Sequence, residues 1–552
     1  MTIRRGTYDA TAFDASPDDV ADVVIIGAGP SGAVYAKYLA SWGFHVVCLE
    51  QGDWVGTAEY TGNRQEYEVS MYGTWHKNGN IRKLPSDYPV DTSEADVIPV
   101  MYNAVGGGTI HYGGHFPRML PSDFRVRTLD GVADDWPLTY EDLAPYYVRT
   151  EAEFAVSAMP GDPAYPDGPA APNPALPINA YGRKLAEGFN ALGYSWWPAP
   201  NAITQSTIGD LVPCVRYGTC EAGCPNGSKA SVDITHWPAA LKAGTTLVTG
   251  AWVSEVTTNA KGLATGVVFS DRNGVQRRLR TDLVVMAANG IGTPRLLLNS
   301  TSAAHPNGLA NSSDLVGRNL MLHPTAMAVG VFDEDMTSWR GPAGQNIHSY
   351  EFYETDVSRG FVRGAKWLSM PTSGPLVTSD LLAPADRDTR GEELLDHIKR
   401  VMGHSVLLVI LTEDLPHEDN RVTLDPVATD RHGVPAAKVT YRRDQNNIDM
   451  VAWNLRKAEE ALHASGARDV ILHDVMPDQP GHLLGTARMG TDPETSVTDP
   501  FGRAHDVSNL WIADGSLYVT SGGVNPTNTI AALALRGVTE LVRRAADQEV
   551  AS

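Results

Sequence analysis

The segment at residues 22–52, DVVIIGAGPSGAVYAKYLASWGFHVVCLEQG, constrains the fold more strongly than any other part of the chain. It begins with a continuous apolar run at 23–26, which is typical of a strand buried in a parallel sheet. Three glycines follow in the spacing GxGxxG, and a helical segment then ends at Gly43. A second apolar strand runs to Glu50. This order predicts the first βαβ unit of a doubly wound α/β domain.

The glycines and the acid of this unit suit a dinucleotide. Gly27 permits a tight turn, Gly29 lets the backbone approach a pyrophosphate, and Gly32 lets helix and strand pack closely. Glu50 is placed for the ribose hydroxyls and favours FAD or NAD over NADP, because a carboxylate repels the extra phosphate. A glycine turn without a ligand is the alternative. No second GxGxxG follows a strand, so we do not expect a reductase that binds both flavin and nicotinamide.

The size and charge of the chain limit its class. Its 552 residues are too many for one simple core, so we expect two or more domains. The net charge of −21 repels phosphate backbones and anionic lipid, so neither nucleic acid nor a membrane is expected as a partner. No stretch approaches ~18 uninterrupted apolar residues. Few cysteines and no signal-like apolar segment at the N-terminus lead us to expect a cytoplasmic protein of unknown oligomeric state.

Further glycine-rich and small-residue segments lie at intervals along the chain. A loop, AVGGGTIHYGGHFPR, occupies 104–118, and a buried strand followed by a turn and a helix is expected in LVVMAANGIGTPRLLLNS at 283–300. LVGRNLMLHPT follows at 315–325, and GHLLGTARMG at 481–490 precedes the final segment at 509–542. Together with the βαβ unit at 22–52, these segments occur in the order found in the glucose–methanol–choline family of FAD-dependent oxidoreductases. The chain resembles that family over most of its length.

The resemblance implies an α/β fold, α+β overall, of two domains. A Rossmann-like FAD domain would be assembled from the discontinuous segments 1–130, 240–315 and 470–552. A sheet-and-helix substrate domain would comprise 131–239 and 316–469, because DDWPLTYEDLAPYY at 134–147 resembles the start of that domain in the family. A purely NAD-dependent dehydrogenase and a non-catalytic flavoprotein are the rival classes, and the C-terminal segments have no role in the first.

Two details resemble pyranose oxidases and bacterial glycoside oxidases within the family. VGGGTIHY at 105–112 is similar to VGGMSTHW, whose histidine carries the flavin, so His111 is expected either to bind the flavin covalently or to pack beside it. GVNPTNTI at 523–530 is similar to GANPTLTA, with Asn525 where most members have histidine. These details imply a sugar or glycoside as the substrate, oxidised at a secondary hydroxyl on carbon 3 or carbon 2.

The chemistry of alcohol oxidation assigns two roles. A hydride moves from carbon to the flavin while a base removes the hydroxyl proton, and histidine, with an unperturbed pKa near 6.5, suits that base. The resemblance implies His482 as the base and Asn525 as the partner that orients the substrate hydroxyl. It also implies a set of FAD contacts: Gly27, Gly29, Ser31, Gly32, Glu50, Gly107, Thr109, His111, Val253, Ala288, Asp514, Gly515, Asn525 and Thr527.

Three of the four cysteines lie together, as Cys214-x5-Cys220-x3-Cys224. They could hold an iron–sulfur cluster, form a disulfide, or occupy a plain turn. The cluster-bearing dehydrogenases of the family have a similar segment, but their cysteines begin as a pair followed by x4 and x3 spacings. We therefore expect a turn without a metal, and an oxidase that passes electrons from flavin directly to oxygen or a small acceptor. The alternative is a sugar or alcohol dehydrogenase that passes electrons through a cluster at these three thiols.

Overall fold

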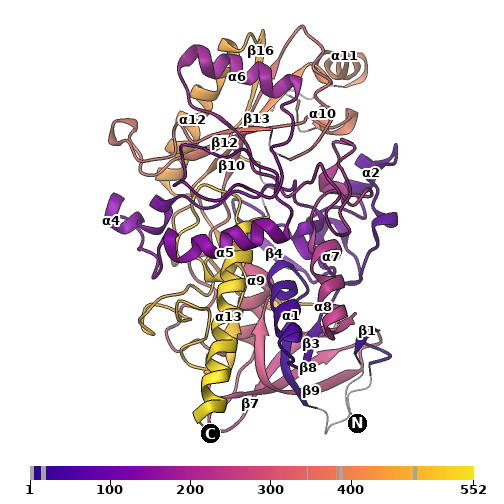
Figure 1. The fold of residues 1–552 in the computed structure, drawn as a ribbon, viewed down its shortest axis with the longest axis vertical. Coiled ribbons are helices and arrows are strands. Elements are labelled where there is room, and N and C mark those ends of the chain that lie inside the picture. The colour runs from indigo at the N-terminus through magenta and orange to yellow at the C-terminus, as the bar shows by residue number, and fades with distance from the viewer. Residues whose placement is uncertain are drawn as a thin grey trace.

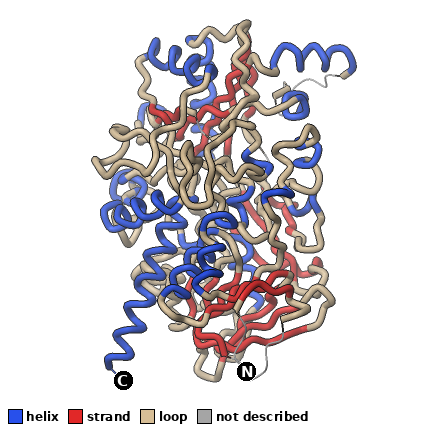
Figure 2. Tube along the Cα trace, turned by 45° about the vertical axis from the view of Figure 1, so that its right-hand side comes forward, coloured by secondary structure: helices blue, strands red, loops and turns tan. Residues whose placement is uncertain are grey.

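A computed structural model describes residues 5–13, 20–344, 346–380, 382–383, 390–476 and 481–551. Its strands gather at the two ends of an elongated molecule, with a region rich in loops between them (Figure 2). The strands β3, β8 and β9 lie near the lower end in Figure 1, and β10, β12, β13 and β16 lie near the upper end. The two ends correspond to two separate sheets.

The lower sheet has eight strands and is mainly parallel in its centre. Its order is β1 (Gly6–Asp9), β6 (Thr246–Thr249), β3 (Val46–Leu49), β2 (Val20–Ile26), β9 (Gln276–Met286), β8 (Ala264–Ser270) and β7 (Trp252–Thr258), with β17 (Leu510–Ile512) paired to β9. The pairs β7–β8 and β8–β9 are antiparallel, and the other pairs are parallel. The expected βαβ unit is therefore present as β2, α1 (Pro30–Ser41) and β3.

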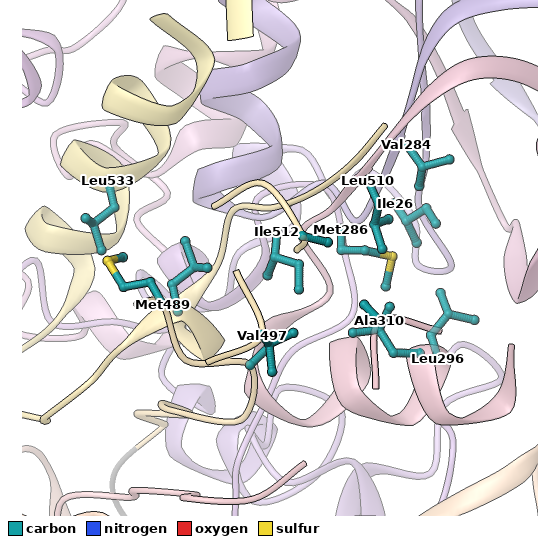
Figure 3. Close-up of a cluster of buried hydrophobic side chains, with 14 of the residues drawn as sticks. Ile26, Val284, Met286, Leu296, Ala310, Met489, Val497, Leu510, Ile512 and Leu533 are labelled. Atoms are coloured by element: carbon teal, nitrogen blue, oxygen red, sulfur yellow. The ribbon is translucent and has the colours of Figure 1, made fainter. Parts of the chain in front are cut away.

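Both faces of this sheet are covered at its centre, which explains why the runs at 23–26 in β2 and 46–49 in β3 are apolar without alternation. Val23 and Ile25 belong to the core that includes α1, with α8 (Trp237–Ala243) and α13 (Thr527–Ala551) packed on α1. Val24 and Ile26 belong to the opposite core, together with Leu296 of α9 (Asn289–Asn299). Figure 3 shows this second core, in which side chains from β2, β9 and β17 meet those of α9 and of the C-terminal segment.

The upper sheet is antiparallel and has six strands. Its order is β16 (Asp469–His473), β10 (Thr325–Val331), β13 (Ser405–Thr412), β12 (Ala365–Met370), β11 (Ile347–Ser349) and β5 (Trp197–Pro198). The helices α6 (Ala180–Leu192) and α12 (Gln445–Ala464) share a core with it. A third sheet joins β14 (Arg421–Thr429), β15 (Pro435–Tyr441) and β4 (Val90–Ala95).

The remaining helices are short, apart from α5 and α11. They are α2 (Tyr67–Met71), α3 (Gly79–Arg82), α4 (Val126–Asp130), α5 (Tyr140–Glu153), α7 (Val232–Thr235), α10 (Pro375–Asp380) and α11 (Gly391–Val401). The α5 helix packs along α13. It begins at a capping box, because the Thr139 side chain accepts from the Asp142 backbone N–H while the Asp142 carboxylate accepts from the Thr139 N–H.

The predicted α/β class is confirmed. All eight strands of the lower sheet come from the segments 1–130, 240–315 and 470–552 that we expected to form the FAD domain. The upper sheet comes from 131–239 and 316–469, except that β16 crosses the expected boundary at 470. In the third sheet, β4 of the first segment pairs with β15 of the other domain. The exact division into domains stays a prediction.

Candidate active site

A cavity of ≈ 340 Å³ lies where the two sheet regions meet. Its wall includes β2, β3 and α9 of the lower sheet region, β12 and β13 of the upper one, and the segments 100–115 and 481–483. Every residue that the sequence suggested for the site lines it except Gly32. These are Gly27, Gly29, Ser31, Glu50, Gly107, Thr109, His111, Val253, Ala288, His482, Asp514, Gly515, Asn525 and Thr527.

Gly32 lies behind the cavity wall and has a packing role. A Cβ added at Gly32 would come 2.0 Å from the carbonyl oxygen of Gly27, so α1 approaches the turn too closely for any side chain. At Gly27 the φ angle is +103°, and an added Cβ would lie 2.4 Å from the carbonyl oxygen of Ala287. A Cβ at Gly29 would meet no protein atom within 4 Å. Because Gly29 caps the N-terminus of α1, this open space suits a pyrophosphate.

Two buried acids border the same end of the cavity. The Glu50 carboxylate accepts hydrogen bonds from the backbone N–H groups of Ala28 and Gly52, each at 2.8 Å, while burial raises its pKa. The Asp514 carboxylate accepts from the Thr293 hydroxyl at 2.6 Å and from the Ser516 N–H at 3.0 Å. These bonds fix both side chains at the wall, so their positions do not depend on a ligand.

The glycine-rich loop places His111 against the cavity. The Nδ1 of His111 lies 2.5 Å from the carbonyl oxygen of Glu221, which can only accept, so Nδ1 carries the hydrogen. Its Nε2 is buried and has no hydrogen-bond partner among the described residues. Burial holds the pKa of His111 well below 6.5, so the ring is neutral. An unpartnered, proton-free nitrogen beside the cavity suits contact with a flavin.

His482 lines the part of the cavity that we call the reaction end, together with Asn525 and His115. It is paired with a second histidine. Its Nδ1 lies 2.9 Å from Nδ1 of His323, and the two rings are perpendicular. Burial is the main reason that the pKa of His482 falls well below 6.5, and nearby His323, His115, Lys77 and Lys366 lower it further. The imidazole is therefore unprotonated at neutral pH, which is the state a base needs.

Asn525 lies one residue before the Pro526–Thr527 start of α13. Lys366 of β12 donates from Nζ to the Asn525 Oδ1 at 3.3 Å. Lys366 is fully buried, and burial holds the pKa of its amine well below 10.5. Because Thr527 is the first residue of a long helix and lines the cavity, the positive end of the helix dipole also lies there.

Sequence reasoning missed several residues at this end. His323 and His115 lay within segments that it singled out, at 315–325 and 104–118, but neither was chosen. His115 lines the cavity with its Nε2 buried and unpartnered within the described ranges, and burial lowers its pKa to about 3. Lys366 and Lys77 carried no sequence signal, because a single lysine in a strand or loop is usually a surface residue.

The three clustered cysteines lie in a separate loop. All are free, and they line a second cavity of ≈ 20 Å³ with Arg216, Gly223 and Ser228. The Cys214 and Cys224 sulfurs accept backbone N–H groups from Arg216 and Ser228, at 3.4 and 3.3 Å. Across the described part of the chain, no three His, Cys, Asp or Glu side chains converge closely enough to hold a single metal ion. Within those same ranges, no helix is long and apolar enough to span a membrane.

Comparison with known families identifies the family to which the chain belongs. Models of the GMC oxidoreductase family match residues 171–325 and 416–534, and a model of an NAD(P)-binding Rossmann-like domain matches residues 25–87. The chain belongs to the GMC oxidoreductases, a family of FAD-dependent enzymes that oxidise CH–OH groups. The sequence-based expectation of an FAD-dependent oxidoreductase of this family is confirmed.

Two relatives and one solved structure illustrate the similarity. The chain is 39% identical to 2-methyl-1,2-propanediol dehydrogenase of Mycolicibacterium austroafricanum, over 96% of each chain. It is 32% identical to paromamine 6'-oxidase of Streptomyces fradiae, over 96% of this chain and 93% of the relative. A structure of formate oxidase from Aspergillus oryzae superposes with a TM-score of 0.64 at 14% identity, covering 97% of this chain and 100% of the other. The last similarity concerns the fold alone.

Proposed function

We propose that this enzyme oxidises a secondary hydroxyl of a sugar or glycoside, at carbon 3 or carbon 2, to a ketone. The observation that carries the proposal is that His482 and Asn525 line the same cavity as the GxGxxG turn and Glu50. One cavity therefore joins a dinucleotide cradle to a neutral histidine and an amide. We also propose that the fourteen lining residues named above, together with Gly32 behind them, make up the functional site.

Each residue has a role that its geometry permits. FAD, when bound, accepts the hydride from the carbinol carbon. His482 takes the proton of the substrate hydroxyl, because burial keeps its ring unprotonated. Asn525, whose Oδ1 is held by Lys366, orients that hydroxyl through its amide. His111 would lie beside the cofactor, and its proton-free Nε2 is the atom that would bond a covalently attached flavin.

The relatives support a polyhydroxylated substrate. One acts on a diol and another on paromamine, by their names. In 2-methyl-1,2-propanediol the carbon at position 2 is tertiary and has no hydrogen to give as a hydride, so only its primary hydroxyl can be oxidised to a carbonyl. A primary hydroxyl is therefore the main competitor to the secondary position that we propose for this enzyme. The buried histidines and lysine at the reaction end offer several hydrogen-bonding groups for a polyol.

The electron acceptor that we propose is oxygen or a small molecule. A second candidate, transfer through an iron–sulfur cluster, is favoured by one observation. Lys229 donates from Nζ to the carbonyl oxygens of Ile110 and Tyr112, which flank His111, and also to that of Cys220. The cysteine loop is thus linked through Lys229 to the glycine-rich loop at 104–118, which carries His111. In a cluster each thiolate binds its own iron, so the three thiols need not converge on one point.

The size of the second cavity nevertheless favours direct transfer. Its ≈ 20 Å³ is close to the space that one water molecule needs, so a cluster would have to widen the loop. Burial also raises the pKa values of Cys214 and Cys220, which favours the protonated thiols over the thiolates that would bind iron. The cluster therefore stays the second candidate.

Spectroscopy of the purified protein tests these proposals together. We expect two resolved flavin bands that are bleached under anaerobic conditions by a sugar or glycoside, with the ketone as product. Bleaching only by primary alcohols or diols would overturn the secondary position. Colour that stays in an acid precipitate would show a covalent flavin. A broad brown shoulder together with about three irons per chain would replace direct transfer with the cluster.

A further inference from the structure

We infer that His323 is a positioning residue, whose contact with His482 fixes the tautomer that lets His482 act as a base. The contact at issue is the 2.9 Å approach of the two Nδ1 atoms. The inference rests on the proposed role of His482. It assigns a specific atom to that role, since only one of the two ring nitrogens of a neutral histidine can accept a proton.

The far side of the His323 ring determines where its hydrogen lies. Its Nε2 makes a hydrogen bond with the carbonyl oxygen of Gly522. A carbonyl oxygen can only accept, so Nε2 carries the hydrogen. The His323 side chain is fully buried, and burial lowers its pKa to about 4. The ring is therefore neutral at physiological pH, and its Nδ1 has no hydrogen and can only accept.

The tautomer of His482 follows from that of His323. Since the Nδ1 of His323 can only accept, the Nδ1 of His482 must donate to it. The pKa of His482 also lies well below 6.5, so its second nitrogen, Nε2, then has a free lone pair. The contact with His323 occupies Nδ1, and His482 lines the cavity. Nε2 is thus the atom left to take the proton of the substrate.

The surrounding structure holds the Gly522 carbonyl and His323 in place together. Asp414 accepts from the Leu322 N–H at 2.7 Å through its carboxylate. The Asp414 backbone exchanges two hydrogen bonds with the Ser521 hydroxyl, at 2.9 and 2.8 Å. The Gly523 N–H donates to the Tyr353 hydroxyl at 2.7 Å. Asp414 therefore holds both Leu322, the residue before His323, and Ser521, the residue before Gly522.

Two substitutions at this position separate positioning from packing. His323→Leu puts an apolar side chain of similar size in the place of the ring and removes the acceptor. His323→Asn keeps an acceptor oxygen near the position of Nδ1. We expect the leucine variant to reduce its flavin about 10–100-fold more slowly with substrate KM little changed, and the asparagine variant to recover most of that loss. His397→Leu, a buried histidine of α11 whose Nε2 contacts the Thr378 carbonyl, is the matched control and should reduce flavin at the wild-type rate.

The tautomer itself is measured by ¹⁵N NMR of the holoenzyme labelled at histidine, with the His482 signal identified by its loss in His482→Ala. We expect a neutral ring protonated at Nδ1 in the wild type and a mixture of tautomers in His323→Leu. A wild-type His482 protonated at Nε2 overturns the inference even if the leucine variant does not fold. Equal rates and tautomers in the leucine variant and the wild type also overturn it. If His482→Ala reduces flavin normally, the proposed function fails instead, while the tautomer remains a separate result.

Discussion

At the cofactor end of the cavity the wall is mainly backbone, whereas at the reaction end it is made of buried side chains. Gly27, Gly29 and Gly107 expose main chain to the cavity at the first end. At the second end, two histidines touch each other and Lys366 holds Asn525. The first end depends on the absence of side chains, and the second depends on the hydrogen-bond partners of those present.

This difference predicts different failures at the two ends. A change at the cofactor end should abolish binding of FAD, because added atoms occupy the space of the ligand or of the backbone. A change at the reaction end should leave FAD bound and slow its reduction, because only the proton transfer or the orientation of the substrate is lost. The variants below test this separation.

His482→Ala should show the largest effect on the rate. Removal of the base should slow flavin reduction by substrate by ~10²–10⁴-fold, while the FAD content stays that of the wild type. Anaerobic stopped-flow absorbance gives the rate, and the flavin absorbance per chain gives the content. His463→Ala on α12, whose Nδ1 contacts the Ala467 carbonyl, serves as the control. Near-normal reduction in His482→Ala would disprove its role as the base.

Arg363→Leu should cause the largest loss of stability. The Arg363 side chain is fully buried and bonds Asp123 and Glu413, each at 2.7 Å. Burial raises the pKa of both acids and the arginine charge opposes that rise, so its loss leaves buried carboxyl groups unpaired. We expect a destabilisation of about 3–5 kcal/mol, measured by denaturant unfolding.

The control for this effect is Arg468→Leu, because Arg468 and its partner Asp333 are both largely exposed. Its loss should cost less than about 1 kcal/mol. Since Asp123 also binds Tyr353, which holds Gly523, Arg363→Leu should disturb the reaction end as well. Equal unfolding midpoints for the two variants would show that the buried cluster adds nothing to stability.

Gly32→Ala tests the cofactor end. The new Cβ would lie 2.0 Å from the Gly27 carbonyl oxygen, so the turn that carries the cradle must move. We expect the protein to be isolated mostly without FAD and to lose about 1–3 kcal/mol of stability. Gly56→Ala is the matched control, because its Cβ would have no neighbour closer than 3.8 Å. Full FAD content in Gly32→Ala would contradict the close packing of α1 on the turn.

Lys366→Met should have the smallest effect of the four. It removes the donor to the Asn525 Oδ1 but keeps a long side chain in the same buried position. The amide of Asn525 then loses the donor that holds its Oδ1, and we expect kcat/KM to fall about tenfold, with FAD content unchanged. The control is Lys399→Met, an exposed lysine of α11. A loss of FAD in Lys366→Met would contradict the expectation that changes at the reaction end leave the cofactor bound.

The sequence alone was sufficient for the cofactor end. The order of strand, GxGxxG, helix, strand and Glu50 is local, and its packing depends on contacts between residues close in the chain. The buried parallel strands could also be predicted from their continuous apolar runs, because both faces of a parallel sheet are covered. His482 and Asn525 were chosen only because their segments resemble those of a family, since sixteen histidines give no local reason to choose one.

Only the tertiary structure decided the reaction end. His323 reaches His482 from a segment far away in the sequence, Gly522 supplies the carbonyl that fixes its tautomer, and Lys366 approaches Asn525 from the upper sheet. No local sequence pattern predicts these three contacts, because a hydrogen bond depends on the distance between two groups in space and not on their spacing along the chain. Sequence thus determined where the backbone makes room for a cofactor, and tertiary packing determined which nitrogen is left to take a proton.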